Sequence, residues 1–377
     1  MLGLYVHVPF CSAICNYCNF NRGLFDERLK RQYVQALGAE IARAGDGSAA
    51  DTIFFGGGTP SLLEPFEIGA IIAALRQGFD LAASAEVTLE TNPETVTTER
   101  LAGFRAAGVT RVSFGVQSFR DDELIRLSRI HSAARAREAV AQARAAGFDN
   151  LSLDLMMWLP QQTIGQWLES VDGLIALDPD HASLYLLELY PNAPIREAMA
   201  REHWSLAPDD DAADMYLAAL DRLDAAGFEQ YEISNVAKEG RSSRHNLKYW
   251  QDGEWLGFGC GAHSTRGGTR WKNVSATEDY IAAVTHGGDL RTDVRAMTLR
   301  ERGEEAAFTG LRLTGGVDLA AIRDAYGVDL WEECGAELSR FVEAGVLTYD
   351  DRRLRLNRRG MLLANEVMQV LFTPSVR

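Results

Sequence analysis

Residues 11–18 read Cys11-Ser-Ala-Ile-Cys15-Asn-Tyr-Cys18 and directly follow the apolar run Leu2–Phe10. Three of the chain's five cysteines therefore fall within eight residues. A loop of this kind can fold three sulfurs onto one small soft-metal object, and a [4Fe–4S] cluster normally takes four thiolates. With three local thiolates, one iron of such a cluster is left for another ligand.

Zinc is the alternative occupant of this loop. Structural zinc needs four ligands, commonly from two paired knuckles. No second Cys or His pair lies nearby in the sequence, and His7 falls inside a predicted strand. Clustered cysteines in a cytosolic chain bind metal or act in catalysis more often than they form disulfides. The sequence therefore favours a cluster with one open iron.

The composition is that of a soluble globular protein. The 377 residues are 46% hydrophobic and 24% charged, which is enough for one large domain and a smaller one. The net charge of −15 argues against a nucleic-acid binder. No apolar run approaches the length of a transmembrane helix. The N-terminal run lacks a basic flank and reads as a strand rather than a signal peptide, so we expect a cytoplasmic protein.

Apolar, β-rich runs alternate six times with helical stretches, which predicts a parallel α/β fold. Periodicity leaves an open sheet and a full or partial barrel as alternatives. In either, ligands bind at the carboxyl ends of the strands. The predicted strands are Gly3–Pro9, Asp51–Phe55, Glu86–Glu90, Arg111–Gly115, Leu151–Met157 and Ala182–Leu189, and the helices between them are Glu27–Ala44, Pro65–Gln77, Thr98–Ala107, Ala133–Ala146 and Ile164–Leu177.

Glycine and polar residues gather where these strands end. The cysteine loop follows the first strand. Because parallel strands end at one edge, these residues should form one site. They are Gly56-Gly57-Gly58-Thr59-Pro60 after the second strand, Glu90, Asn92 and Pro93 at the third, Gln117 and Ser118 at the fourth, Asp154 within the fifth, and Glu188 and Tyr190 at the sixth.

The alternation fades after about Asp209. A Gly-rich piece at 257–263 suggests close backbone packing. Beyond about Arg300 we predict helices Asp318–Tyr326 and Leu330–Ala344, a hairpin, and a last helix Arg358–Val370. That order resembles a winged helix, although its mixed-charge wing does not favour DNA binding.

The cysteine spacing followed by a Gly-Gly-Gly-Thr-Pro turn resembles the radical S-adenosylmethionine (radical SAM) superfamily. The resemblance implies a partial (β/α)6 TIM-like barrel with a small, mostly helical, winged-helix-like C-terminal domain. It implies that Cys11, Cys15 and Cys18 hold a [4Fe–4S] cluster. S-adenosylmethionine would chelate the open iron and be cleaved to a 5′-deoxyadenosyl radical.

Longer motifs narrow the resemblance to the oxygen-independent coproporphyrinogen III oxidase group. They are Tyr5-Val-His-Val-Pro-Phe-Cys11, Phe114-Gly-Val-Gln117 and Tyr231-Glu-Ile-Ser-Asn235. The resemblance implies Tyr5 beside the S-adenosylmethionine carboxylate, Tyr17 near its adenine, Gly57, Gly58 and Thr59 at its amino group, Glu90 at the ribose or amino group, and Gln117, Arg129 and Asp154 as further cofactor contacts. Carbonyls and hydroxyls suit an ammonium, and a carboxylate suits ribose hydroxyls.

Two departures from the oxidase pattern point to heme handling. The oxidase motif continues to a fourth cysteine, at the position where this chain has Phe20. The chain also carries His245-Asn-Leu-Lys-Tyr249-Trp250, which resembles the heme chaperone subgroup HemW. Imidazole is a common axial heme ligand, and the aromatic residues offer surface to a macrocycle. The alternatives are the oxidase itself, for which enzyme activity stays open, and other radical chemistry.

The resemblance divides the chain into a radical SAM barrel at 1–225, a segment with the heme-binding motif at 226–298, and a helical domain at 299–377. The implied partners are heme, heme-acceptor proteins and an electron donor. Peripheral membrane contact and a homodimer stay open. Related chains usually have glycine at the positions of Trp158 and Gln161, so we expect the Trp158 side chain to alter the pocket floor.

Overall fold

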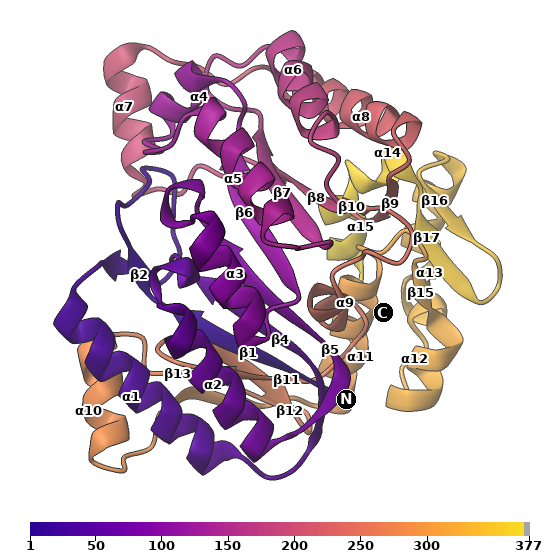
Figure 1. Cartoon of the computed structure of the whole chain (residues 1–377). Coiled ribbons are helices and arrows are strands. Elements are labelled where there is room, and N and C mark those ends of the chain that lie inside the picture. Colours follow the sequence, from indigo (N-terminus) through magenta and orange to yellow (C-terminus); the bar gives the residue numbers. More distant parts are fainter. Residues whose placement is uncertain (373–377) are drawn as a thin grey trace.

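A sheet of twelve strands forms the centre of the computed structural model, which describes residues 1–372 (Figure 1). Six neighbouring strands are parallel and form the predicted partial barrel. They are β1 (Leu2–Val8), β4 (Ala49–Gly57), β5 (Asp80–Thr91), β6 (Arg111–Gln117), β7 (Leu151–Met157) and β8 (His181–Leu186). The predicted α/β radical SAM fold is confirmed, with β8 ending three residues earlier than predicted.

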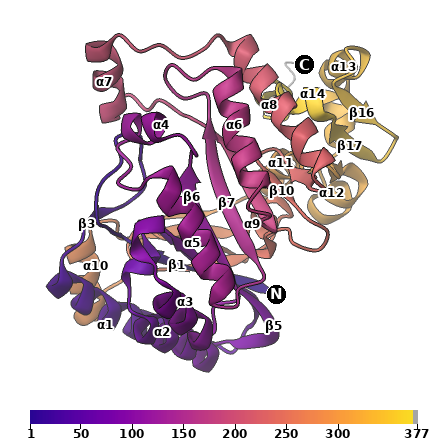
Figure 2. The same cartoon turned by 45° about the horizontal axis from the view of Figure 1, so that its top comes forward.

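Helices cover the outer face of this sheet (Figures 1 and 2). Several begin where a hydroxyl side chain accepts a hydrogen bond from the first turn, as Thr97, Ser132 and Thr163 do. The helices are α1 (Glu27–Ala44), α2 (Pro65–Gly78), α3 (Thr98–Ala107), α5 (Ala133–Ala145), α6 (Ile164–Ile175) and α8 (Asp209–Ala225). The five helices predicted between the strands match the first five of these to within two residues.

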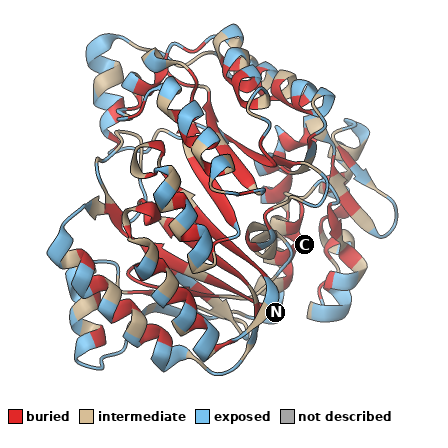
Figure 3. Ribbon diagram, viewed as in Figure 1, coloured by how far each residue is buried: buried red, intermediate tan, exposed pale blue. Residues whose placement is uncertain are grey.

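The two faces of the sheet have different chemistry. Leu4, Val6 and Val8 of β1 are buried against the covering helices, while Tyr5 and His7 point to the opposite face. Figure 3 shows that the central parallel strands are mostly buried. The inner face of the barrel is rich in buried polar groups, such as Thr88, Ser113 and His181. This polar lumen leads to the strand ends where the site lies.

The middle segment adds strands to both edges of the sheet. On one side β10 (Asn235–Ala237) pairs with β8 and with β9 (Glu229–Glu232). On the other side β11 (Trp255–Phe258) pairs with β1. The sheet continues from β11 through β12 (His263–Arg266), β13 (Thr269–Asn273) and β14 (Arg291–Ala296), with α9 (Arg244–Trp250) and α10 (Thr277–Thr285) beside it. The domain boundaries at 225 and 298 stay predictions.

The C-terminal part packs around its own hydrophobic core. Its helix predicted over 358–370 divides into α14 (Arg358–Met361) and α15 (Ala364–Val370). The other elements are α11 (Leu299–Gly310), β15 (Val317–Asp318), α12 (Leu319–Tyr326), α13 (Leu330–Glu343), β16 (Leu347–Tyr349) and β17 (Arg353–Leu356). Among residues 1–372, no helix is both long and apolar enough to cross a bilayer.

Short elements that the sequence did not predict frame the ligand edge. The strand β2 (Phe10–Cys11) pairs with β3 (Gly23–Leu24) and closes the base of the cysteine loop. Two short helices, α4 (Asp121–Arg126) and α7 (Pro194–Glu202), lie near the same edge (Figure 2). Strands of two residues and helices of six and nine residues are too short to show a clear period, which is why the pattern did not reveal them.

The loop after β7 explains the unusual residues at 158 and 161. Trp158 and Gln161 both adopt positive φ values, of 61° and 62°, which glycine adopts at little cost. The Trp158 indole donates to the Ala207 carbonyl at 2.8 Å. The side chain is absent from the lining of the pocket described below. The expectation that Trp158 alters the pocket floor is therefore wrong, because the left-handed backbone directs it toward Ala207.

Replacing Gln161 with glycine is expected to stabilise the protein by about 0.5–1 kcal/mol. A residue with a Cβ costs about 1–2 kcal/mol in the left-handed conformation, and the larger backbone entropy that glycine loses on folding offsets part of this gain. The side chain of Gln161 is exposed and makes one long contact, of 3.4 Å, with Ser205. Denaturant unfolding measures the change. Gln161→Ala keeps the Cβ and should not stabilise; an equal gain in both variants would contradict this explanation.

Candidate functional site

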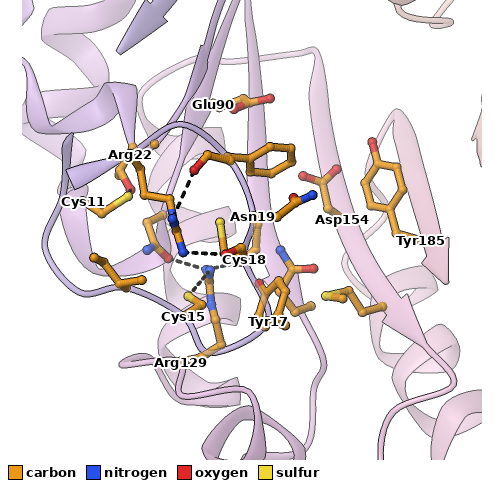
Figure 4. Close-up of a pocket in the computed structure, with 18 of the residues that line it drawn as sticks. Cys11, Cys15, Tyr17, Cys18, Asn19, Arg22, Glu90, Arg129, Asp154 and Tyr185 are labelled. Atoms are coloured by element: carbon orange, nitrogen blue, oxygen red, sulfur yellow. Dashed lines mark hydrogen bonds between the residues drawn. The ribbon is translucent and has the colours of Figure 1, made fainter. Parts of the chain in front are cut away.

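A cavity of about 400 Å³ opens at the carboxyl ends of the parallel strands (Figure 4). Its wall combines the cysteine loop with the ends of β4, β5, β6, β7 and β8. Eleven predicted site residues line it: Cys11, Cys15, Tyr17, Cys18, Gly57, Gly58, Thr59, Glu90, Gln117, Arg129 and Asp154. Two predicted residues, Tyr5 and His245, are not in the lining.

The cysteine loop is held from several sides. Thr59 Oγ1 lies 3.7 Å from Cys11 Sγ, and Arg129 Nη1 lies 3.5 Å from Cys15 Sγ. Arg22 donates to the Cys18 carbonyl at 2.5 Å. The three thiols are partly exposed to the cavity. The loop therefore presents three free sulfurs in one small space, with cationic side chains on two sides of it.

The glycine turn packs tightly against the end of β1. The Gly58 N–H donates to the Val8 carbonyl at 2.8 Å, and the Thr59 N–H donates to the Phe10 carbonyl at 2.7 Å. A Cβ on Gly57, whose φ is 112°, would lie 2.5 Å from the His7 ring. Glycine is therefore required at position 57, because a side chain there would collide with His7. An ammonium ligand only donates hydrogen bonds, so it would use the carbonyls of the turn and the Thr59 hydroxyl as acceptors.

Two half-buried carboxyl groups, those of Glu90 and Asp154, line the cavity. Glu90 Oε2 accepts from the Gly57 N–H at 3.3 Å, and Asp154 accepts from the Ser113 hydroxyl at 3.3 Å. Burial, followed by the charge of Asp154, raises the pKa of Glu90 to about 8. Burial also raises the pKa of Asp154. A cation bound between these groups would relieve their mutual repulsion.

Gln117 and Arg129 carry polar atoms without partners. Gln117 has a positive φ of 69°, and its buried Oε1 accepts no hydrogen bond. Arg129 donates to Asn92 Oδ1 and to the Gly115 carbonyl, both at 2.6 Å, while its buried Nε has no partner. Strained backbone and unsatisfied buried groups are characteristic of ligand sites. The chemistry of this wall therefore fits a polar ligand beside the three sulfurs.

Tyr17 and Tyr5 differ in position. Tyr17 lines the cavity within the cysteine loop, and burial raises the pKa of its phenol. Tyr5 lies within the barrel, where its hydroxyl lies 3.1 Å from His7 Nδ1 and its ring stacks on Phe54. A contact between Tyr5 and a carboxylate in the cavity would require its hydroxyl to leave His7.

His245 lies near the opposite end of the barrel. The ring packs against Gly3, at the start of β1, where a Cβ would lie 3.0 Å from it. The site lies beyond Val8, at the other end of the same strand and about 16 Å from Gly3. The ring is fully buried. Its Nδ1 bonds to Thr52 Oγ1 at 2.8 Å, and its Nε2 bonds to Tyr249 Oη at 2.9 Å. Burial lowers the pKa of His245 to about 3, so the ring is neutral, but neither nitrogen is available to iron in this conformation.

Several lining residues were missing from the predicted site. Asn92 was noted at a strand end, but its bond to Arg129 could not be inferred from sequence. Tyr185 could have been found, because it continues the alternation that points residues of β8 inward. Met156 and Leu186 lie near the ends of β7 and β8, and the others come from loops, where no regular alternation indicates which way a side chain points. The set includes Ile14, Asn19, Phe20, Arg22, Met156, Tyr185, Leu186 and Leu187, whereas Asn92, Glu188 and Tyr190 had been expected at the strand ends.

The zinc alternative would need several ligands around one ion. Within residues 1–372, no three His, Cys, Asp or Glu side chains are gathered closely enough to hold a single metal ion.

Comparisons with known proteins agree with this architecture. Residues 5–174 match the family description "Radical SAM superfamily", and residues 297–363 match "HemN C-terminal domain". The chain folds like a solved coproporphyrinogen III oxidase (HemN) from Escherichia coli, with a TM-score of 0.86 at 23% identity, covering 99% of this chain and 90% of that one. The fold and the cysteine loop thus define a radical SAM protein.

Full-length relatives are more specific. The chain is 36% identical to "Heme chaperone HemW" of Bacillus subtilis over 97% of this chain and 98% of that protein. It is 37% identical to "Heme chaperone HemW" of Mycobacterium tuberculosis, covering 98% of this chain and 94% of that protein. It is also 38% identical to mouse "Radical S-adenosyl methionine domain-containing protein 1, mitochondrial", covering 98% and 86%. The chain belongs to the HemW family of radical SAM proteins.

Proposed function

We propose that this chain binds heme and passes it to acceptor proteins, and that its pocket holds a [4Fe–4S] cluster with S-adenosylmethionine. The observation that carries the proposal is the full-length similarity to proteins named heme chaperones, together with three free thiols in one open pocket. Acceptor proteins and an electron donor belong to the proposal, as does a cytoplasmic location. A homodimer stays an expectation.

In this proposal the cysteines of the pocket bind the cluster and its polar residues bind S-adenosylmethionine. Cys11, Cys15 and Cys18 would hold the cluster, since they are the thiols that reach the cavity. The cluster, when bound, supplies an electron to the sulfonium. The unsatisfied Gln117 Oε1 and the carboxylates Glu90 and Asp154 would hold polar and cationic parts of S-adenosylmethionine.

The affinity for S-adenosylmethionine is expected to rise with pH up to about 8. The pKa of Glu90 is about 8 in the free chain, and the ligand's positive charge favours the ionised carboxylate, so binding below this pH releases a proton. The gain is at most about tenfold per pH unit. Calorimetry at pH 7 in buffers of different ionisation enthalpy measures the released proton.

Glu90→Gln is the matched control for this proton release, because it keeps the shape and removes the titrating group. The ligand's own amino group also titrates, so the informative quantity is the difference between wild type and variant. Equal proton release in both proteins would show that Glu90 is not the titrating group.

Heme titration of the anaerobically reconstituted chain tests the central proposal. We expect stoichiometric binding seen in the visible spectrum. A changed spectrum with weaker binding in His245→Ala would show that this ring becomes a ligand. Such ligation requires the bonds to Thr52 and Tyr249 to open. Failure of the wild type to retain heme would refute the proposed function, whereas unchanged binding by His245→Ala would refute only the role of His245.

The alternative activity is oxidative decarboxylation of coproporphyrinogen III. Phe20, 64% exposed at the cavity mouth, occupies the position of the oxidase's fourth cysteine and supports heme handling instead. Anaerobic incubation with S-adenosylmethionine, a reductant and coproporphyrinogen III separates the two. Formation of protoporphyrinogen would favour the enzyme.

A further inference from the structure

The mouth of the cavity is unusually apolar for a protein surface. Among the described residues, sixteen large hydrophobic side chains are exposed, and five of them line this one cavity. Exposed apolar groups scattered singly need no explanation, but a cluster around a pocket indicates a binding surface. We call these five residues the rim: Ile14, Phe20, Tyr185, Leu186 and Tyr190.

The rim comes from two separate parts of the chain. Ile14 and Phe20 belong to the cysteine loop and are 41% and 64% exposed. Leu186 and Tyr190, at the end of β8 and just beyond it, are 47% and 38% exposed. The Ile195 N–H donates to the Asn16 carbonyl at 3.0 Å, which ties the chain after the rim back to the cysteine loop. The two parts therefore face the same opening.

Two arginines without carboxylate partners accompany the rim. Arg22 donates to the Cys18 carbonyl at 2.5 Å and to the Phe20 carbonyl at 3.2 Å. Arg196 donates to the Leu189 carbonyl at 3.3 Å and is exposed. Neither forms an ion pair within residues 1–372. The nearby Glu188 carboxylate is already bonded to the Tyr190 hydroxyl. The mouth thus combines apolar surface with the Arg22 guanidinium and the Glu188 carboxylate in its lining, while Arg196 of α7 lies just outside the lining, in a chain whose net charge is −15.

The inner wall has the opposite character. Glu90, Asp154 and Gln117 are polar and half-buried in the cavity wall, so an apolar macrocycle placed there would leave their charges and hydrogen-bonding groups without partners. A flat apolar ring with acidic substituents instead matches the rim and its two arginines. Heme has this composition, with an apolar macrocycle and two propionates.

We propose that heme binds across the rim, with its macrocycle against Phe20 and Leu186 and its propionates toward Arg22 and Arg196, above the polar cavity. This site rests on the proposed heme-binding function and locates it at the end of the barrel opposite His245. Bound heme covers the cavity, so it should slow the exchange of S-adenosylmethionine beneath it.

Heme titrations of Phe20→Ala and Leu186→Ala test the site. Burying an exposed apolar side chain against heme contributes free energy to binding, so removing that side chain should weaken heme binding about tenfold. Arg196→Ala should weaken binding and reduce its dependence on salt. Phe66→Ala is the control, because Phe66 is 74% exposed on α2 and lies outside the rim. Circular dichroism verifies that each variant is folded.

Metal-free protoporphyrin distinguishes the rim from ligation by histidine. Rim binding depends on the macrocycle and propionates, so the metal-free ring should bind the wild type with similar affinity and should also lose affinity in Phe20→Ala. Binding through His245 requires iron. A slower release of radiolabelled S-adenosylmethionine in the presence of heme is the second expected result.

The outcomes separate the site from the function. Heme binding that persists unchanged in Phe20→Ala and Leu186→Ala, but is lost in His245→Ala, would overturn the rim site and leave the proposed function intact. Wild-type protein that retains no heme would refute the proposed function itself. Weaker heme binding by Phe20→Ala and Leu186→Ala, with normal heme binding by Phe66→Ala and His245→Ala, would support heme binding at the rim.

Discussion

Cys15→Ser is expected to purify without its iron–sulfur cluster and without the capacity to bind S-adenosylmethionine. The loop offers three thiols to the cavity, so the substitution leaves two thiolates where the cluster needs three. The Arg129 guanidinium, 3.5 Å from this sulfur, would also lose its partner there. Iron and sulfide analysis after anaerobic reconstitution, with the visible absorbance of the cluster, measures the loss.

Cys334→Ser is the matched control for cluster loss. Cys334 is buried in the C-terminal core and does not reach the cavity. This variant should retain the iron and sulfide content of the wild type. A cluster that survives in Cys15→Ser, or is lost equally in both variants, would contradict the assignment of the three-cysteine loop.

Glu232→Ala is expected to lower the free energy of unfolding by about 3–5 kcal/mol, because it leaves Arg312 without its buried counter-ion. Glu232 is fully buried and accepts from the Ser234 N–H at 3.1 Å, from the Asn235 amide, and from Arg312 Nη2 at 3.2 Å. The Ile233 N–H donates to the Arg312 carbonyl at 3.1 Å beside it. The interaction therefore joins the barrel edge to the C-terminal part. Chemical unfolding measures the change.

Glu229→Ala tests whether the effect is specific. Glu229 lies on the same strand but is exposed, so its removal should change stability by no more than about 0.5 kcal/mol. In Glu232→Ala we also expect faster proteolysis near residue 312. Equal stability losses in the two variants would show that burial of Glu232 is not responsible.

Much of the fold could be read from sequence because burial on one face of a strand or helix leaves a period. The helices Glu27–Ala44 and Thr98–Ala107 coincide with their predicted bounds. The last helix did not, since Arg358–Met361 and Ala364–Val370 are separated by a break that apolar spacing does not reveal. Cys260 and Cys334, the two cysteines outside the loop, are both buried.

The site was predictable where it follows strand ends. Gly57, Glu90, Gln117 and Asp154 come together because parallel strands deliver their carboxyl ends to one edge. Their electrostatics were not predictable: the raised pKa of Glu90 depends on burial beside Asp154, 64 positions away in the sequence. Likewise, no local pattern could report that Arg129 reaches both Asn92 and Cys15.

The sequence alone determined the three-thiol loop, the βα repeat and the family resemblance, because these depend on residue type and spacing. The tertiary structure decided which groups face the cavity. It buried His245 between Thr52 and Tyr249, and it exposed Phe20 and Leu186 at the mouth. The physical reason is that exposure and hydrogen-bond partners depend on elements distant in sequence. The three cysteines thus mark the site, while the packing around them determines which surface a macrocycle can reach.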